Sequence, residues 1–135
     1  DAINEKTNQL LDLMFEEPIK LFFSLYRPSV DNQSLGKISV NLQIYLGGNT
    51  HTTINTLSSG EADRISIAVS SVLNSLSDSP ILFFDECMST LESDVREKCL
   101  ILIRETLVKN GKSVIDICHE SVEGYHDLTI PVLKL

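Results

Sequence analysis

The spacing of apolar residues divides this chain into two halves that follow different periods. The first half opens with apolar positions on one side of a helix over residues 2–16, which Pro18 ends. Residues 38–45 then alternate strictly between apolar and polar side chains, as a half-buried strand does. Residues 27–36 are rich in Pro, Ser, Asp, Asn and Gly, which predicts a surface loop. The strands expected in this half cover 19–26, 38–45 and 50–54.

The second half alternates helical periods with short apolar runs. Amphipathic helices are predicted over 61–76 and 91–109. The apolar runs at 81–84 and 113–117 are predicted as buried strands, and a last strand is expected over 127–135. Helix and buried strand in alternation are typical of βαβ units. We therefore expect an α/β fold with a mostly parallel sheet flanked by helices and a small antiparallel portion.

Composition narrows the class of protein. The 135 residues suit one ordinary domain, and 42% apolar against 22% charged residues supports a packed core. The three cysteines lack paired spacing, which favours a reducing, intracellular compartment. No apolar run reaches the roughly 18 residues of a membrane span, so no membrane partner is expected. The net charge of −8, from 19 acidic and 11 basic residues, makes DNA binding through bulk charge alone a poor expectation.

Two adjacent acids, Asp85 and Glu86, end the apolar run at 81–84. Ligands of open α/β sheets bind beyond the carboxyl ends of the strands, where these acids are expected. Because side chains alternate along a strand, one acid can hold a metal while the other faces a reacting group. The alternative is a strand that ends in a solvated acidic turn.

Small residues, Ser58, Ser59 and Gly60, stand directly before Glu61 and the helix predicted there. Backbone N–H groups at a helix start, together with the helix dipole, favour an anion. The Ser58 hydroxyl can add a hydrogen bond to a phosphate oxygen. The alternative is an ordinary serine cap with Glu61 as a favourable acid in the first turn.

A histidine, His119, follows the strand predicted at 113–117. If the two apolar strands are neighbours in the sheet, His119 lies beside Asp85 and Glu86 at one sheet edge. A lone histidine is more often structural than catalytic, so its position relative to the two acids decides its interpretation.

Taken in order, these signals resemble the C-terminal half of an ABC-type ATPase head. Residues 57–61 resemble the signature motif, 81–86 resemble Walker B, 89–92 resemble the D-loop, and His119 resembles the switch histidine. The likeness covers roughly residues 38–135 and is nearest to the SMC-like, SbcC-type double-strand-break repair ATPases of viral, phage and cellular origin. The stretches that carry this choice are 57–64, 84–89 and 117–120.

The resemblance implies a role for each of these residues. Asp85 would hold Mg²⁺, Glu86 would position and deprotonate the attacking water, and His119 would bond the γ-phosphate of ATP. Ser59 stands where the family usually has Gly, and Glu92 stands where it usually has Asp. The residues expected to contact the nucleotide of an opposite head, or to run along the dimer interface, are Ser58, Ser59, Gly60, Glu61, Ser89 and Glu92.

The resemblance also implies partners. An N-terminal lobe of the same protein would supply Walker A and join this lobe through a long coiled coil. Residues 1–17 are then the helical stub of the arm and 18–135 the C-terminal lobe, and a chain that opens without Met is expected to be cut from something longer. Further expected partners are a second head in a homodimer, an SbcD-type nuclease and DNA. The expected location is the cytoplasm, the nucleus or a nucleoid.

Other functions stay open. They are a chromosome-organising or recombination clamp of SMC type without a nuclease, a transporter nucleotide-binding domain, and a non-enzymatic interaction domain that kept the fold. Gly111-Lys112-Ser113 mimics the end of a P-loop, but position 106 is Thr, and a helix precedes and a strand follows. The chain therefore has no Walker A of its own.

Overall fold

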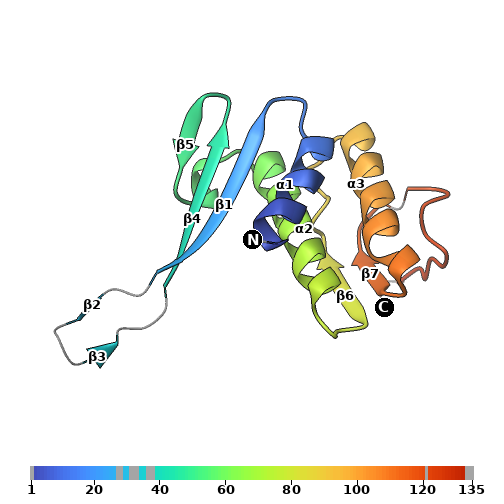
Figure 1. The fold of residues 1–135 in the computed structure, drawn as a ribbon. Helices are drawn as coiled ribbons and strands as arrows, with labels where there is room; N and C mark the ends of the chain where they lie inside the picture. The colour runs from blue at the N-terminus through green and yellow to red at the C-terminus, as the bar shows by residue number, and fades with distance from the viewer. Residues whose placement is uncertain (1, 27–28, 31–33, 36–38, 121, 133–135) are drawn as a thin grey trace.

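The computed structural model describes residues 2–26, 29–30, 34–35, 39–120 and 122–132. Its helices lie between a three-stranded antiparallel sheet and a two-stranded parallel sheet (Figure 1). The helices are α1 (Ala2–Met14), α2 (Ser59–Leu76) and α3 (Ser93–Thr106), with 3-10 turns η1 (Ile54–Thr56) and η2 (Val108–Asn110). The strands are β1 (Ile19–Tyr26), β2 (Ser29–Val30), β3 (Ser34–Leu35), β4 (Ser39–Leu46), β5 (Asn49–His51), β6 (Ile81–Asp85) and β7 (Ser113–Ile117).

The larger sheet is antiparallel, with the strand order β1-β4-β5. Leu21 and Ile44 are paired in its register and fully buried against the helices. Further along the same face, the paired residues Leu25 and Val40 are 73% and 63% exposed. The alternation of β4 therefore buries its apolar face only where helices cover it. Ile38, which belongs to the predicted strand, lies outside the described residues.

Two asparagines of α1 close the outer edge of β1. Asn8 donates to the carbonyl of Leu21 and accepts from its N–H, both at 2.8 Å. Asn4 makes the same pair of bonds with Phe23, at 3.0 and 2.8 Å. Asn4 and Asn8 are four positions apart and therefore lie on one face of the helix. Leu21 and Phe23 are two positions apart and therefore direct their backbone N–H and C=O groups to the same edge of the strand, so each asparagine meets one of them. The helix thus satisfies backbone groups that an edge strand leaves open.

The second half of the chain forms a parallel βαβ unit. β6 pairs with β7 in parallel, from Ile81 opposite Ser113 to Asp85 opposite Ile117, and α3 connects the two strands. Phe84 is buried in the common core, and Leu82 packs against that core. The α/β fold class predicted from the sequence is confirmed. Over the described residues, two strands form the parallel portion, and the antiparallel portion consists of the three-stranded sheet and the short pair β2-β3.

Two expectations about strands are wrong. The run at 81–84 was expected to be covered on both faces, but Phe83 is 62% exposed, on the face that it shares with Ile115. The strand expected from residue 127 does not form over the described residues 127–132, where Val132 is 92% exposed. A strand needs a neighbour to bond its N–H and C=O groups, and the described part of the chain places none there.

Boundaries shift by small amounts elsewhere. The first helix ends at Met14, two residues before its predicted end, and Leu11 and Met14 belong to the core. The predicted strand at 50–54 is shorter, at Asn49–His51, because η1 follows. The loop predicted at 27–36 contains the short antiparallel pair of β2 and β3. Among the described residues, no helix has the length and apolar character needed to cross a membrane.

Replacing Asn8 with Ala should destabilise the fold. The change leaves the N–H and C=O of Leu21, whose side chain is fully buried, without their partner on α1. An unmet pair of this kind costs about 1–3 kcal/mol in free energy of unfolding. Urea denaturation followed by circular dichroism measures the loss. Gln9→Ala, at the exposed neighbouring position, is the matched control, and equal midpoints for both variants would contradict this account of α1.

Candidate functional site

The carboxyl edge of the parallel pair brings Asp85, Glu86 and His119 into one region. Asp85 is the last residue of β6 and lies opposite Ile117, the last residue of β7. The N–H of Glu86 donates to the carbonyl of Ile117 at 2.8 Å, so the pairing continues one residue beyond the strand. The backbone of Glu86 has φ of 52°, a positive value that no other described non-glycine residue has. Sparsely populated backbone angles of this kind cluster at functional sites.

Glu86 and His119 meet directly. Glu86 Oε1 lies 2.9 Å from His119 Nε2, and their side chains are 50% and 82% exposed. A contact this exposed contributes little to stability because water competes for both side chains. The contact instead leaves a carboxylate and an imidazole open to solvent at the same sheet edge. A carboxylate there can accept a proton from water, and an imidazole can hydrogen-bond an anion.

The residues at this edge fit one way of holding a divalent cation. The described residues contain no group of three or more His, Cys, Asp or Glu side chains placed to enclose a metal. Asp85 therefore offers a single exposed carboxylate. Mg²⁺ commonly binds one or two carboxylates and completes its shell with waters and phosphate oxygens. The donor chemistry of Asp85 suits that mode and does not suit an all-protein metal cage.

The start of α2 forms a capping box. The N–H of Ser58 donates to Glu61 Oε2 at 2.8 Å, and the N–H of Glu61 donates to Ser58 Oγ at 3.4 Å. The Ser58 backbone bond lowers the pKa of Glu61, and the Ser58 hydroxyl lowers it further. The box is thus complete with Glu61 ionised, and it weakens as the pH falls toward that lowered pKa. Ser58 therefore does cap this helix, as the alternative interpretation of the sequence expected.

The glycine at this helix start has no backbone reason to be glycine. The other described glycines, Gly47, Gly48, Gly111 and Gly124, all have positive φ, which favours glycine in their turns. Gly60 has no such angle, and a Cβ placed on it would come no nearer than 3.8 Å to Leu91. Ser59 lies in the first turn of α2 without positive φ, so a serine at this position causes no backbone strain.

The link between Glu86 and α3 packs against the start of α2. The N–H of Ser89 donates to the carbonyl of Glu86 at 3.1 Å, and Leu91 is buried beside Gly60. Ser89 and Glu92 are exposed, and Glu92 precedes α3 without forming a side-chain cap. Residues 87–92 thus connect the acidic sheet edge to the helix start, which are two of the regions singled out from the sequence.

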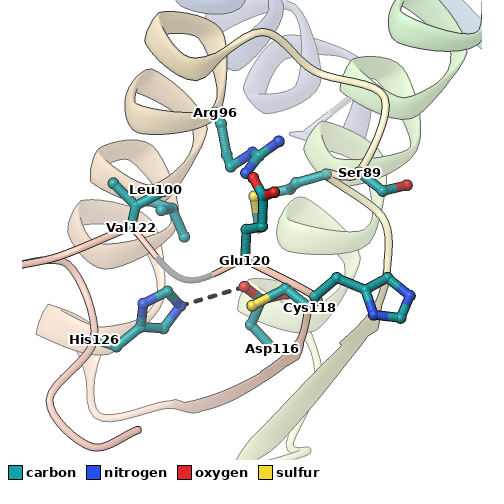
Figure 2. Close-up of a pocket in the computed structure, with 10 residues that line it drawn as sticks. Ser89, Arg96, Leu100, Asp116, Cys118, Glu120, Val122 and His126 are labelled. Atoms are coloured by element: carbon teal, nitrogen blue, oxygen red, sulfur yellow. Dashed lines mark hydrogen bonds and ion pairs between the residues drawn. The ribbon is translucent and has the colours of Figure 1, made fainter.

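Sequence reasoning missed a cavity of about 220 Å³ that Ser89 and His119 also line. Figure 2 shows His126 pointing toward Asp116, with Nε2 and Oδ2 3.3 Å apart. Asp116 alternates with Val114 on the inward face of β7, so a carboxylate on that face was the signal in the sequence. Burial is the main cause that raises the pKa of the Cys118 thiol, and the charge and hydrogen bonding of Asp116 raise it further. The raised pKa favours the protonated thiol.

Three further residues around the helix start have contacts to which the sequence analysis assigned no role. The Thr90 hydroxyl donates to the carboxylate of Asp63, and Arg64 bonds the carbonyl of Gly60 at 3.1 Å. Asp63 and Arg64 lie in the stretch 57–64 and Thr90 lies in 89–92, both of which carry the resemblance, but those motifs do not predict these contacts. The packing of the loop at 87–92 on α2 brings Thr90 to Asp63, and the turn of α2 itself brings Arg64 to the Gly60 carbonyl.

Comparison with known proteins places this geometry on a known fold. No protein-family profile matches the chain. The chain is 28% identical, over 136 residues, to a protein of Invertebrate iridescent virus 6 described as "Uncharacterized protein 050L". The match covers 94% of this chain and 12% of that protein, so the chain spans a small part of its relative's length.

Solved structures of SMC proteins resemble the chain more broadly. One, from work on ATP-driven dimerization and DNA-stimulated activation of SMC ATPases, has a TM-score of 0.70 at 16% identity, over 99% of this chain and 78% of that one. The Smc head domain of Pyrococcus furiosus, bound to the C-terminal domain of ScpA, has a TM-score of 0.62 at 18% identity, over 87% of this chain and 28% of that one. The Smc head domain of Pyrococcus yayanosii has a TM-score of 0.60 at 19% identity, over 85% of this chain and 21% of that one. At these identities the likeness establishes the fold, and the chain has the α/β fold of part of an SMC ATPase head.

Proposed function

We propose that this chain is the C-terminal lobe of an SMC-like ATPase head that hydrolyses ATP between two heads. The observation that carries the proposal is the contact between Glu86 and His119 beside Asp85, at the carboxyl edge of β6 and β7. That edge is where ligands of α/β sheets bind. The SMC-head fold supports the same assignment, because it is the fold on which this arrangement of motifs is expected.

The chemistry of these residues suits hydrolysis of a phosphate anhydride. Asp85 would hold Mg²⁺, which when bound neutralises charge on phosphate oxygens. Glu86 would orient the attacking water and accept its proton, and an exposed carboxylate 2.9 Å from an imidazole is placed for that exchange. His119 would donate a hydrogen bond to the terminal phosphate as charge develops there.

The start of α2 would serve the nucleotide of an opposite head. Ser58 and Ser59 are exposed at a helix N-terminus, where backbone N–H groups and the dipole favour an anion. Gly60 lets a phosphate approach the backbone closely, which accounts for a glycine without positive φ. Glu61 would fix the helix start through its capping box. Ser89 and Glu92, exposed in the adjoining link, would run along the interface between heads.

A lobe that carries Walker A would cover the open face of the parallel pair. That face exposes Phe83 and Ile117 at 62% and 51%, and Leu128, Ile130 and Val132 are exposed in the irregular segment that follows. Large apolar side chains exposed together on one face are typical of interaction sites. The lobe would also supply the neighbouring strand that residues 127–132 lack. Residues 1–17 would then continue from the coiled-coil arm that joins the two lobes.

Within this proposal, the cellular role is DNA double-strand-break repair or end processing with an SbcD-type nuclease. The sequence stretches 57–64, 84–89 and 117–120 support that choice. A chromosome-organising clamp is the second candidate, favoured by similarity to Smc heads that are bound to ScpA. Affinity purification with an SbcD-type nuclease and with a ScpA-type protein as alternative baits separates the two roles.

The isolated chain should bind ATP weakly and hydrolyse it negligibly, because it lacks a P-loop. Adding a matching lobe with Walker A should restore turnover and bury Phe83. Phosphate release assays on the chain, on the lobe and on their mixture test this. Robust turnover by the pure chain alone would overturn the proposal.

Replacing Glu86 with Gln should trap ATP in the reconstituted head. The amide keeps the size of the side chain but cannot accept the proton, so turnover should fall by about 10²–10⁴-fold while ATP binding persists. Turnover and nucleotide retention are measured together, and Glu123→Gln, at an exposed turn, is the matched control. Wild-type turnover by the Glu86 variant would remove Glu86 as the base.

Replacing Gly60 with Ala should separate folding from phosphate contact. The added methyl group has room beside Leu91, and Ala favours a helix over Gly by up to about 1 kcal/mol, so the fold should be kept. ATP-dependent dimerisation of the reconstituted head should weaken, since a Cβ would stand where the phosphate approaches. Ser66→Ala, exposed later on α2, is the control. Unchanged dimerisation by the Gly60 variant would contradict its role at the helix start.

A further inference from the structure

The start of α2 is held on one side by Arg64. The Arg64 guanidinium donates to the carbonyl of Gly60 through Nε and to the carbonyl of Met14 through Nη1, both at 3.1 Å. It also lies 3.8 Å above the centre of the Phe15 ring. These three contacts tie the first turn of α2 to the end of α1, so this side of the helix start has a fixed support.

The start of α2 also contacts the link at 87–92. The Thr90 hydroxyl donates to the Asp63 carboxylate, across 27 positions of sequence. Leu91, buried below, places Cδ2 3.8 Å from the Cβ position of Gly60. The side chains of two neighbouring residues of α2, Asp63 and Arg64, therefore connect its first turn to two different parts of the chain.

The hydrogen bond between Thr90 and Asp63 is not needed to stabilise the fold. The cap of α2 is already complete through Ser58 and Glu61. Thr90 is exposed, and a hydrogen bond open to water contributes little to stability because water replaces it readily. What the bond does fix is the position of the link relative to the exposed N–H groups of the helix start.

We propose that Asp63 and Thr90 are positioning residues that join the start of α2 and the link at 87–92 into one rigid surface for an opposing head. This inference rests on the proposed function, because the surface matters only if a second head docks there. The two segments then present Ser59 and Ser89 in a fixed relation, and the opposing head pays no ordering cost for either segment on docking.

A double-mutant cycle in the reconstituted head tests this inference. Thr90→Val keeps the shape of the side chain and removes the hydroxyl, and Asp63→Ala removes the acceptor. Each should weaken ATP-dependent dimerisation roughly fivefold to tenfold, and the double variant should be no weaker than either single one, since both lose the same bond. Thr90→Ser, which keeps the hydroxyl, should restore dimerisation. Analytical ultracentrifugation over a range of ATP concentrations gives the dimer affinities.

Two further measurements exclude a merely structural effect. Loading of ATP into each head, followed with a fluorescent ATP analogue, should not change, and the thermal midpoints should stay near wild type. Asp12→Ala, which breaks an exposed pair with Lys20 at 2.9 Å on α1 and β1, is the matched control and should dimerise normally.

The outcomes separate the inference from the proposed function. A wild-type head that loads ATP and forms no ATP-dependent dimer overturns the proposed function and this inference with it. A wild-type head that dimerises with ATP, while the losses of Thr90→Val and Asp63→Ala add in the double variant, overturns the inference alone. Loss of dimerisation in Thr90→Ser equal to that in Thr90→Val also overturns it.

Discussion

The hydrogen bonds that Asn4 and Asn8 of α1 make with the outer edge of β1 fix the position of that helix on the sheet. An edge strand normally leaves such groups to water or to another chain. With α1 held there, its end presents the Met14 carbonyl and the Phe15 ring to Arg64 of α2. The placement of the helix start that faces solvent thus depends on a helix-to-strand contact in another part of the fold.

The parallel pairing of β6 with β7 is the second constraint. It ends both strands at the same edge, so Glu86 and His119 come within 2.9 Å although α3 separates them in sequence. The same pair leaves one apolar face open, and the described residues 127–132 stay irregular without a neighbouring strand. A polar edge and an exposed apolar face therefore belong to the same pair of strands, which is the arrangement that the proposed head of two lobes requires.

Much of the fold followed from the periods in the sequence. The strand at 19–26 and the helix α2 lie close to where they were expected, because each buries a regular apolar face. The strand at 113–117 also forms, although Val114 faces the core while Ile115 and Ile117 are exposed. The expectation at 127–132 failed for a different reason. Its alternating residues Leu128 and Ile130 satisfy a strand pattern, but the described chain gives that segment nothing to pair with. The period of apolar residues predicts which side chains can be buried together, but it does not identify the surface that buries them.

The sequence by itself determined the α/β class and the types of residue available at the site, since apolar period and the acids ending a buried run are local properties. Tertiary structure alone decided that Glu86 faces His119, that Gly60 needs no special backbone angle, and that Thr90 reaches Asp63. These are relations between segments distant in sequence. They are set by strand pairing and by the packing of a loop on a helix, and no local pattern of residues encodes the distance between two such segments.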